Sequence, residues 1–114
     1  MNKVEAIIRP EKLNDFKEAL VEVGLIGLNV VNVTGRGAQR GVTSGGSRGV
    51  SRYEIDMLPK VKLELVVHDE ATQKAVDTII EHARTGNIGD GKIFMVPIDE
   101  VVRIRTGETG DAAI

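Results

Sequence analysis

The sequence predicts a single α+β domain in which two β-α-β units are joined by a long glycine-rich loop. Three observations carry the prediction: several segments alternate apolar and polar residues, two segments repeat apolar residues at helical spacing, and glycines concentrate between the two halves. A chain of 114 residues can bury one hydrophobic core. The order β-α-β, loop, β-α-β is the split βαβ or ferredoxin-like arrangement.

The first half of the chain changes from a strand pattern to a helix pattern and back. Alternating apolar residues predict a strand over residues 2–9. Pro10 suits the first turn of a helix, where its missing N–H costs nothing, and Gly24 is expected as the C-cap. A run rich in β-branched residues predicts a second strand over residues 28–33. The apolar stripe of the helix is Leu13, Phe16, Leu20 and Val23.

The second half repeats this order. Strict alternation predicts a strand over residues 60–68, and Asp69 is expected to cap a second helix through its side chain. Strands follow at residues 92–96 and, shorter, at residues 101–105. With both helices on one face, the sheet's other face needs cover, which favours oligomerisation. The second helix has the apolar stripe Ala75, Val76, Ile79, Ile80 and Ala83.

Composition excludes several classes of function. The formal net charge of −2 does not indicate a bulk electrostatic affinity for nucleic acid or anionic membranes. The absence of cysteine removes disulfides, thiolate catalysis and cysteine-based zinc sites. No apolar stretch approaches the ~20 residues of a membrane span, and a signal-peptide pattern is lacking. A cytoplasmic protein is therefore expected.

Residues 83–94, ARTGNIGDGKIF, place three glycines and a lysine between the second helix and a strand. Glycines let the backbone approach a ligand, and successive N–H groups beside an ammonium form an anion-binding concavity. Gly86 to Lys92 also fits G-x-x-x-x-G-K, but a P-loop follows a strand, opens a helix and continues with Ser or Thr. Here the order is reversed. The alternatives are an anion cradle and a helix C-cap with a surface lysine.

Residues 35–53 contain six glycines, three serines and four arginines, and no acid occurs between Val23 and Tyr53. Such a loop cannot bury enough apolar surface to fold alone, so we expect it to be mobile without a ligand. A run of one charge sign on a glycine backbone suits docking to acidic or phosphate groups. The alternative is a solvated hairpin extension.

Arg103 and Arg105 are one residue apart in the last predicted strand, so both guanidinium groups should project from one face. Paired arginines suit a polyphosphate, which accepts bidentate hydrogen bonds. The alternative is a charged edge strand that discourages aggregation.

Motifs along essentially the whole chain are similar to those of one family. They are VEAIIRP (residues 4–10), LPKVK (58–62), ARTGNIGDGKIF (83–94) and VVRIRTGE (101–108). The chain thus resembles the PII nitrogen-regulatory signal-transduction proteins. The resemblance implies one domain over residues 1–114, a mobile T-loop at about 37–56, a C-terminal tail at about 107–114, and a compact homotrimer. It also implies that ATP and ADP compete for sites between subunits. 2-Oxoglutarate would bind cooperatively, through the Mg²⁺ of bound ATP.

The resemblance also implies roles for individual residues. Lys92 and the glycines beside it would bind phosphates, Arg103 and Arg105 would reach them from the neighbouring subunit, and Gln39 would ligate Mg²⁺. The expected nucleotide-binding residues are Ile7, Asn29, Gly35, Arg36, Gly37, Ala38, Gln39, Val66, Thr85, Gly89, Asp90, Gly91, Lys92, Arg103 and Arg105. The expected 2-oxoglutarate residues are Gln39, Arg40, Gly41 and Lys60, whose ammonium would pair with a carboxylate.

Two positions depart from the family pattern. Ala38 stands where many members carry an arginine, so either phosphate binding is weaker or Arg36 or Arg40 substitutes. The usual Tyr-Arg-Gly of the T-loop is SRG at residues 47–49. Family members are often modified on a loop tyrosine or serine. Tyr53 and Ser51 are the nearest candidates, but their altered spacing argues against both, and we expect no covalent modification.

The function implied is sensing of ATP, ADP and 2-oxoglutarate, with the T-loop docking onto a partner. Partners in the family include ammonium channels, nitrogen-assimilation enzymes and transcription regulators. Arg48 is the candidate to enter a channel pore, so membrane recruitment would depend on a protein partner. Two other readings remain on this scaffold: a trimeric regulator of a different ligand, and slow ATP hydrolysis as a side activity.

Two further classes fit the residues less well. RNA-recognition-motif domains share the βαββαβ order but stack bases on sheet aromatics, and residues 61–67 contain none, so no direct nucleic-acid binding is expected. For a nucleotide-using enzyme, Glu64 and Asp90 are candidate bases. No nucleophile–base pair is evident, and His68 and His82 fit no metal spacing.

Overall fold

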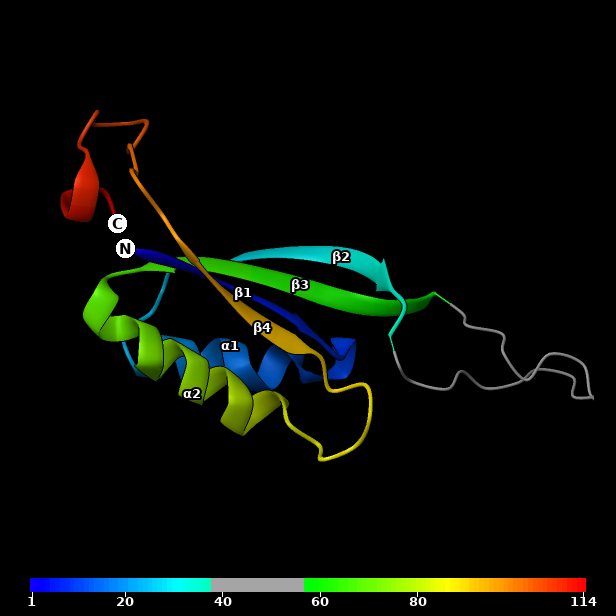
Figure 1. The fold of residues 1–114 in the computed structure, drawn as a ribbon. Coiled ribbons are helices and arrows are strands. Elements are labelled where there is room, and N and C mark those ends of the chain that lie inside the picture. Colours follow the sequence, from blue (N-terminus) through cyan, green and yellow to red (C-terminus); the bar gives the residue numbers. More distant parts are fainter. Residues whose placement is uncertain (38–56) are drawn as a thin grey trace, which may run out of the picture.

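Two β-α-β units build one antiparallel sheet with two helices on one of its faces (Figure 1). The computed structural model describes residues 1–37 and 57–114. The strand order is β2-β3-β1-β4, which confirms the predicted α+β, ferredoxin-like fold. The strands are β1 (Asn2–Ile8), β2 (Asn29–Gly35), β3 (Leu58–Val67) and β4 (Lys92–Pro97), and the helices are α1 (Leu13–Glu22) and α2 (Thr72–Ala83).

The expectations for the loop between β2 and β3 lie outside the described residues. These are its mobility and the roles given to Ala38, Gln39, Arg40, Gly41, Arg48, Ser51 and Tyr53. The structure does describe the two ends from which this segment leaves the sheet, Gly35–Gly37 and Met57–Leu58.

The alternation in β1 and β3 directs one set of side chains onto the helices, as predicted. Phe16 and Leu20 of α1 and Ile79 of α2 are buried against this face of the sheet. Burying an apolar side chain of this size contributes about 1.5–3 kcal/mol, so this layer supplies most of the drive to fold. The buried strand residues are Val4, Ala6, Ile8, Val61, Leu63, Leu65 and Val67.

The end of α1 also agrees with the prediction. Gly24 follows the C-cap residue with φ 86°, a conformation that glycine adopts without the penalty of a Cβ. The N–H of Leu25 then donates to the carbonyl of Leu20 at 2.8 Å, which satisfies one of the last carbonyls of the helix.

The predicted strand over residues 101–105 is wrong. Val102 forms only an isolated bridge with Thr109, and the chain turns between them. The N–H of Arg103 donates to the carbonyl of Glu108 at 2.9 Å, and the N–H of Gly107 donates to the carbonyl of Arg103 at 2.8 Å. These bonds close a tight turn with Gly107 at φ 73°. Arg103 and its neighbour arginine are therefore not side by side on a strand.

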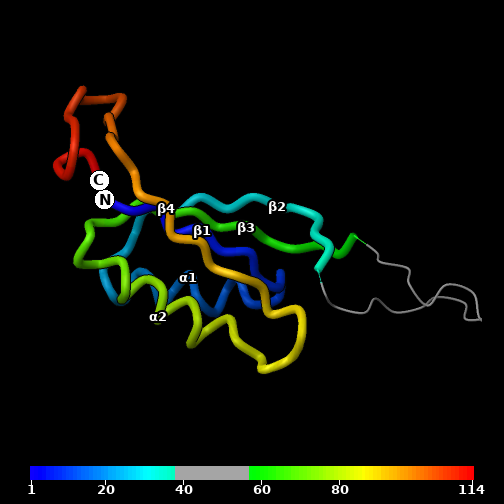
Figure 2. The backbone as a smooth tube through the Cα atoms, in the orientation of Figure 1, coloured from blue at the N-terminus to red at the C-terminus, as the bar shows by residue number. Residues whose placement is uncertain are grey.

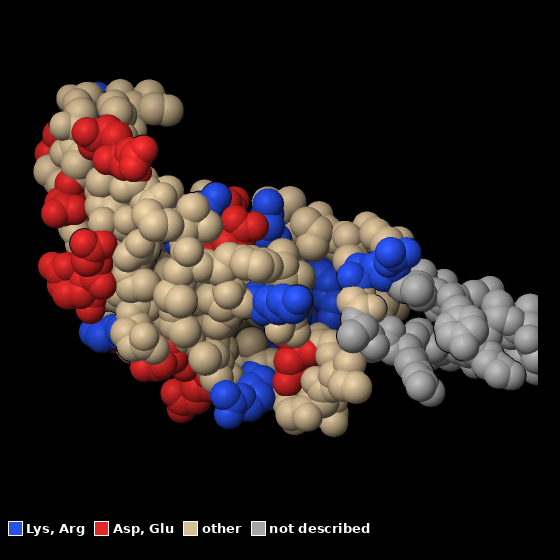
Figure 3. Space-filling view, in the orientation of Figure 1, with Lys and Arg blue, Asp and Glu red and all other residues tan. Residues whose placement is uncertain are grey.

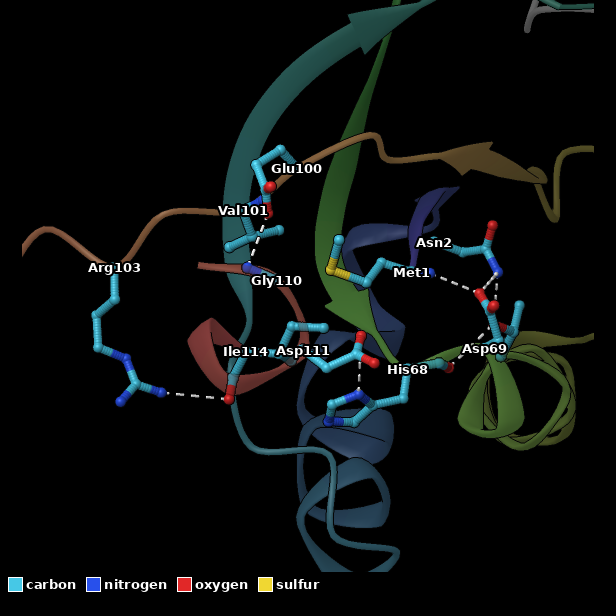
Figure 4. Close-up of polar contacts among 11 residues, drawn as sticks. Met1, Asn2, His68, Asp69, Glu100, Val101, Arg103, Gly110, Asp111 and Ile114 are labelled. Carbon is cyan, nitrogen blue, oxygen red and sulfur yellow. Dashed lines mark hydrogen bonds and ion pairs between the residues drawn. The ribbon is translucent and has the colours of Figure 1, made fainter. Parts of the chain in front are cut away.

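The predicted capping role of Asp69 is also wrong. A 3₁₀ turn, Asp69–Ala71, precedes α2, and the helix has no side-chain cap bond. The Asp69 carboxylate instead accepts hydrogen bonds from the Met1 amino group at 2.6 Å and the Asn2 side-chain amide at 3.2 Å (Figure 4). Asn2 pairs with Val67, so the antiparallel register brings the start of β1 beside Asp69.

The second face of the sheet carries no helix from the described parts of the chain. Lys3 lies on this face between Glu5 and Glu64, at 3.3 and 3.2 Å. Apolar side chains accompany the charges: Phe94 is 48% exposed and Val96 40%. No helix within residues 1–37 or 57–114 is long and apolar enough to span a membrane.

Candidate functional site

All four strands have a terminus at one end of the sheet, and these termini line a cavity of about 500 Å³. β1 and β2 end there, and β3 and β4 begin there, because neighbouring strands are antiparallel. The segment of residues 84–91 between α2 and β4, called loop 84–91 below, supplies another wall. The cavity is lined by Ile7, Val33, Thr34, Gly35, Arg36, Gly37, Leu58, Lys60, Ile88, Gly89, Gly91, Lys92 and Phe94.

Loop 84–91 depends on glycine at positions that no other residue occupies easily. Gly86, Gly89 and Gly91 have φ of 91°, 103° and 105°. Gly91 also lies against β1: a Cβ there would stand 1.7 Å from the carbonyl oxygen of Ile7. The loop therefore approaches the end of β1 as closely as backbone atoms allow.

The Asp90 carboxylate closes the loop on itself. Its Oδ2 accepts from the N–H groups of Thr85 and Gly86, each at 2.8 Å. Its Oδ1 accepts from the Thr85 hydroxyl and from Arg9 Nε, the latter at 3.0 Å. The carboxylate thus has four donors, two of which belong to Thr85. In this geometry Asp90 and Thr85 stabilise the shape of the loop.

These hydrogen bonds also affect the protonation of Asp90. The Thr85 hydroxyl, the backbone N–H of Thr85, Arg9 and the N–H of Gly86 all favour the ionised carboxylate and hold its pKa well below its usual range. Partial burial acts in the opposite direction but is outweighed. Asp90 is therefore ionised at neutral pH, and with four donors on its oxygens it is a weaker base than an ordinary carboxylate.

Lys60 makes a further contact between loop 84–91 and the sheet. Its Nζ donates to the carbonyl of Gly89 at 2.7 Å, so a residue at the start of β3 contacts the loop after α2. Lys92 and Arg36 line the same cavity. Three cationic side chains thus converge on glycine backbone. Figure 3 shows lysine and arginine gathering toward this end of the molecule and acids toward the other.

Arg9 is a site residue that sequence reasoning missed. Its NH2 donates to the carbonyl of Ile88 at 2.8 Å, in addition to the bond from Nε to Asp90. The motif VEAIIRP contains Arg9, but nothing local indicates that its partners lie 79 and 81 positions further along the chain.

Several expected site residues lie away from the cavity. Asn29 and Val66 are on the uncovered face of β2 and β3, since Asn29 pairs with Glu64. Arg103 and Arg105 belong to the C-terminal segment, at the opposite end of the sheet from loop 84–91 (Figure 2). Arg103 donates there to Glu108 at 3.1 Å. It also donates to the main-chain oxygen of Ile114 at 3.3 Å (Figure 4). Within one chain, these arginines and the cavity do not meet.

Other candidates for chemistry are engaged elsewhere. Glu64 is paired with Lys3, and His68 Nδ1 lies 3.6 Å from Asp111. Among the described residues, no three His, Asp or Glu side chains are grouped so as to hold a metal ion. The geometry thus gathers Arg36, Lys60 and Lys92 around one cavity, and Glu64 and His68 do not join them there.

Comparison with known proteins agrees with the sequence motifs. The family model described as "Nitrogen regulatory protein P-II" matches residues 1–108. The chain belongs to the PII family. It is 54% identical over 114 residues to nitrogen regulatory protein P-II 2 of Methanothermobacter thermautotrophicus, covering all of this chain and 97% of that protein. It is equally similar to P-II 1 of Escherichia coli K12 and P-II of Klebsiella oxytoca, over the full length of both. PII proteins are regulatory, and the chain is thus assigned to nitrogen regulation.

Replacing Gly91 by alanine tests the close approach of loop 84–91 to β1. Gly91→Ala should destabilise the fold clearly more than Gly86→Ala. Both glycines have positive φ and share a strain of about 1–2 kcal/mol, but only Gly91 has backbone atoms in the way of a Cβ. Urea unfolding at matched protein concentration measures the free energy of unfolding of both variants. Equal losses would contradict the packing described for Gly91.

Replacing Asp90 by asparagine tests the hydrogen bonds to its carboxylate. The folded-state pKa lies below the unfolded value of about 3.9, so ionised Asp90 contributes stability that is present above pH ~4 and lost as the pH falls below it. Asp90→Asn should therefore have a lower free energy of unfolding than the parent at pH 7, and the difference between the two should become smaller toward pH 3. Asp77→Asn, at an exposed position on α2, is the control. A difference in unfolding free energy that stays constant with pH would refute the hydrogen bonds assigned to the ionised Asp90 carboxylate.

Proposed function

We propose that this PII protein binds ATP or ADP in the cavity beside loop 84–91, together with 2-oxoglutarate, and reports the bound ligand to a protein partner. The observation that carries the proposal is the convergence of Arg36, Lys60 and Lys92 on a glycine loop whose only acid is already paired. Such a cradle fits phosphates, since ammonium and guanidinium groups and bare N–H groups all bind anionic oxygens.

A neighbouring subunit would complete the site. Arg103 and Arg105 cannot reach the cavity of their own chain, but a cyclic homotrimer can place them at the cavity of the next subunit. Two surfaces support assembly. The sheet has an uncovered face that mixes apolar and charged residues, and the C-terminal segment carries Ile104, which is 99% exposed. Asn29 and Val66, on the uncovered face, would then lie where the adenosine part can contact them.

Lys60 would recognise 2-oxoglutarate. Its ammonium donates to a neutral carbonyl, that of Gly89, and a carboxylate is a stronger acceptor for the same charge. Lys60 is also the third residue of β3, the strand that follows residues 38–56 in the chain. A ligand that engages Lys60 can therefore favour one arrangement of that segment over another. Gln39, Arg40 and Gly41 would supply further contacts, with Gln39 ligating the Mg²⁺ of bound ATP.

The partner would be contacted by the T-loop, residues 37–56. Its sequence carries arginines and no acid until Glu54, which suits an acidic or carbonyl-rich surface. An ammonium channel, with Arg48 entering the pore, is the first candidate. Nitrogen-assimilation enzymes and transcription regulators are the others. The protein would act in the cytoplasm and reach a membrane only through such a partner.

Isothermal titration calorimetry tests this function. ATP and ADP should compete for one class of sites, and 2-oxoglutarate should bind only when ATP and Mg²⁺ are both present. Lys60→Ala should keep ATP binding and lose the 2-oxoglutarate response. Lys74→Ala, an exposed lysine on α2, is the matched control and should behave as the parent does. Binding of 2-oxoglutarate without any nucleotide would overturn the proposed order.

A further inference from the structure

Arg9 contacts loop 84–91 at the two residues on either side in sequence of Gly89, the residue that Lys60 contacts. Its side chain is only 19% exposed, with Nε bonded to Asp90 and NH2 bonded to the carbonyl of Ile88. Pro10 restricts the preceding residue to extended backbone, and Arg9 has φ −67° and ψ 135°. The backbone of Arg9 is thus restricted, and the guanidinium group of its side chain contacts two points of the loop. The single ammonium group of a lysine does not reproduce this geometry.

Arg9 also controls the charge of the loop. Asp90 is the only acid in residues 84–91 and lies next to Gly89 and Gly91, which line the cavity. An unpaired carboxylate there would repel an anionic ligand. The contact at 3.0 Å places a compensating positive charge on the Asp90 side chain, so that Lys60, Lys92 and Arg36 dominate the field in the cavity.

We propose that Arg9 is a positioning residue for phosphate recognition, which fixes loop 84–91 in its anion-binding shape and neutralises the Asp90 carboxylate. Arg9 does not line the cavity, so it acts on a ligand through the loop. The inference rests on the proposed nucleotide binding. It assigns a role to a residue that would otherwise be a surface arginine at the end of a strand.

The two parts of this role can be separated by substitution. Arg9→Met removes both bonds and the charge, whereas Arg9→Lys keeps the charge and loses the fork. Asp90→Asn removes the carboxylate charge but leaves an oxygen that can accept from the N–H groups of Thr85 and Gly86. Arg84→Met is the matched control, because it removes an exposed positive charge from the same loop.

Affinity for ATP and ADP should be measured by calorimetry for each variant at one ionic strength, with thermal unfolding as the check on folding. Arg9→Met should weaken ATP binding by about tenfold or more, the scale of a lost charged hydrogen bond. It should weaken ADP binding by less, since ADP carries less charge. Arg9→Lys should lose less than Arg9→Met. Adding Asp90→Asn to Arg9→Met should recover part of the ATP affinity, and Arg84→Met should have a smaller effect than Arg9→Met.

The recovery in the double variant separates the proposed role from a purely structural one, because a second lost contact would only add damage to a loop that needs both residues for its fold. Folded Arg9→Met that binds ATP as the parent does would overturn the inference. So would a double variant that binds more weakly than Arg9→Met. If Arg9→Met does not fold, Arg9→Lys with parental ATP affinity would overturn the fork's role. A parent chain that binds neither nucleotide would instead refute the proposed function itself.

Discussion

The Asp90 carboxylate stands near the end of loop 84–91 and accepts hydrogen bonds from Thr85 and Gly86 at its start and from Arg9, which fixes the shape on which the rest of the candidate site depends. Without these bonds, a glycine-rich segment would have many conformations of similar energy. Asp90 joins the loop's first residues to its last, and Arg9 joins the closed loop to the end of β1. Gly91 then packs against Ile7 with no room for a side chain. The only acid of residues 84–91 thus serves to fix the shape of the loop.

Within one chain, the residues expected at the site lie in two separate places. Loop 84–91, the end of β2 and the start of β3 with Lys60 lie at one end of the sheet. The C-terminal segment with Arg103 and Arg105 lies at the other end (Figure 1). The uncovered face of the sheet carries charged pairs and exposed apolar side chains together, as a surface between subunits does. Assembly would therefore bury the open face and complete the pocket in one step, so that ligand binding and oligomerisation are linked.

Local patterns in the sequence predicted the fold well because burial in β1, β3 and both helices follows from residues a few positions apart. Residues 101–105 show how such a pattern can mislead: Val102 and Ile104 alternate with arginines as in a strand, but the turn at Gly107 and the bonds between Arg103 and Glu108 fold the segment back. Asp69 failed as a cap because its partners come from the start of β1. The contacts of Arg9 connect residues about 80 positions apart, so only the folded chain reveals them. Family motifs singled out residues 83–94, but they did not show that Asp90 is bonded to Thr85 and Gly86 within this segment.

The most direct test of an intersubunit site is complementation between two defective chains. One chain carries Lys92→Ala, and the other carries Arg103→Ala with Arg105→Ala; each alone should bind ATP weakly. When the two are unfolded together and refolded, mixed trimers should contain sites with an intact Lys92 from one subunit and intact arginines from the next. We expect tight ATP binding to return in the mixture, at a fraction of the parental number of sites. A mixture that binds no better than its two components, or an arginine-deficient chain with parental affinity, would show that the cavity does not depend on a neighbour.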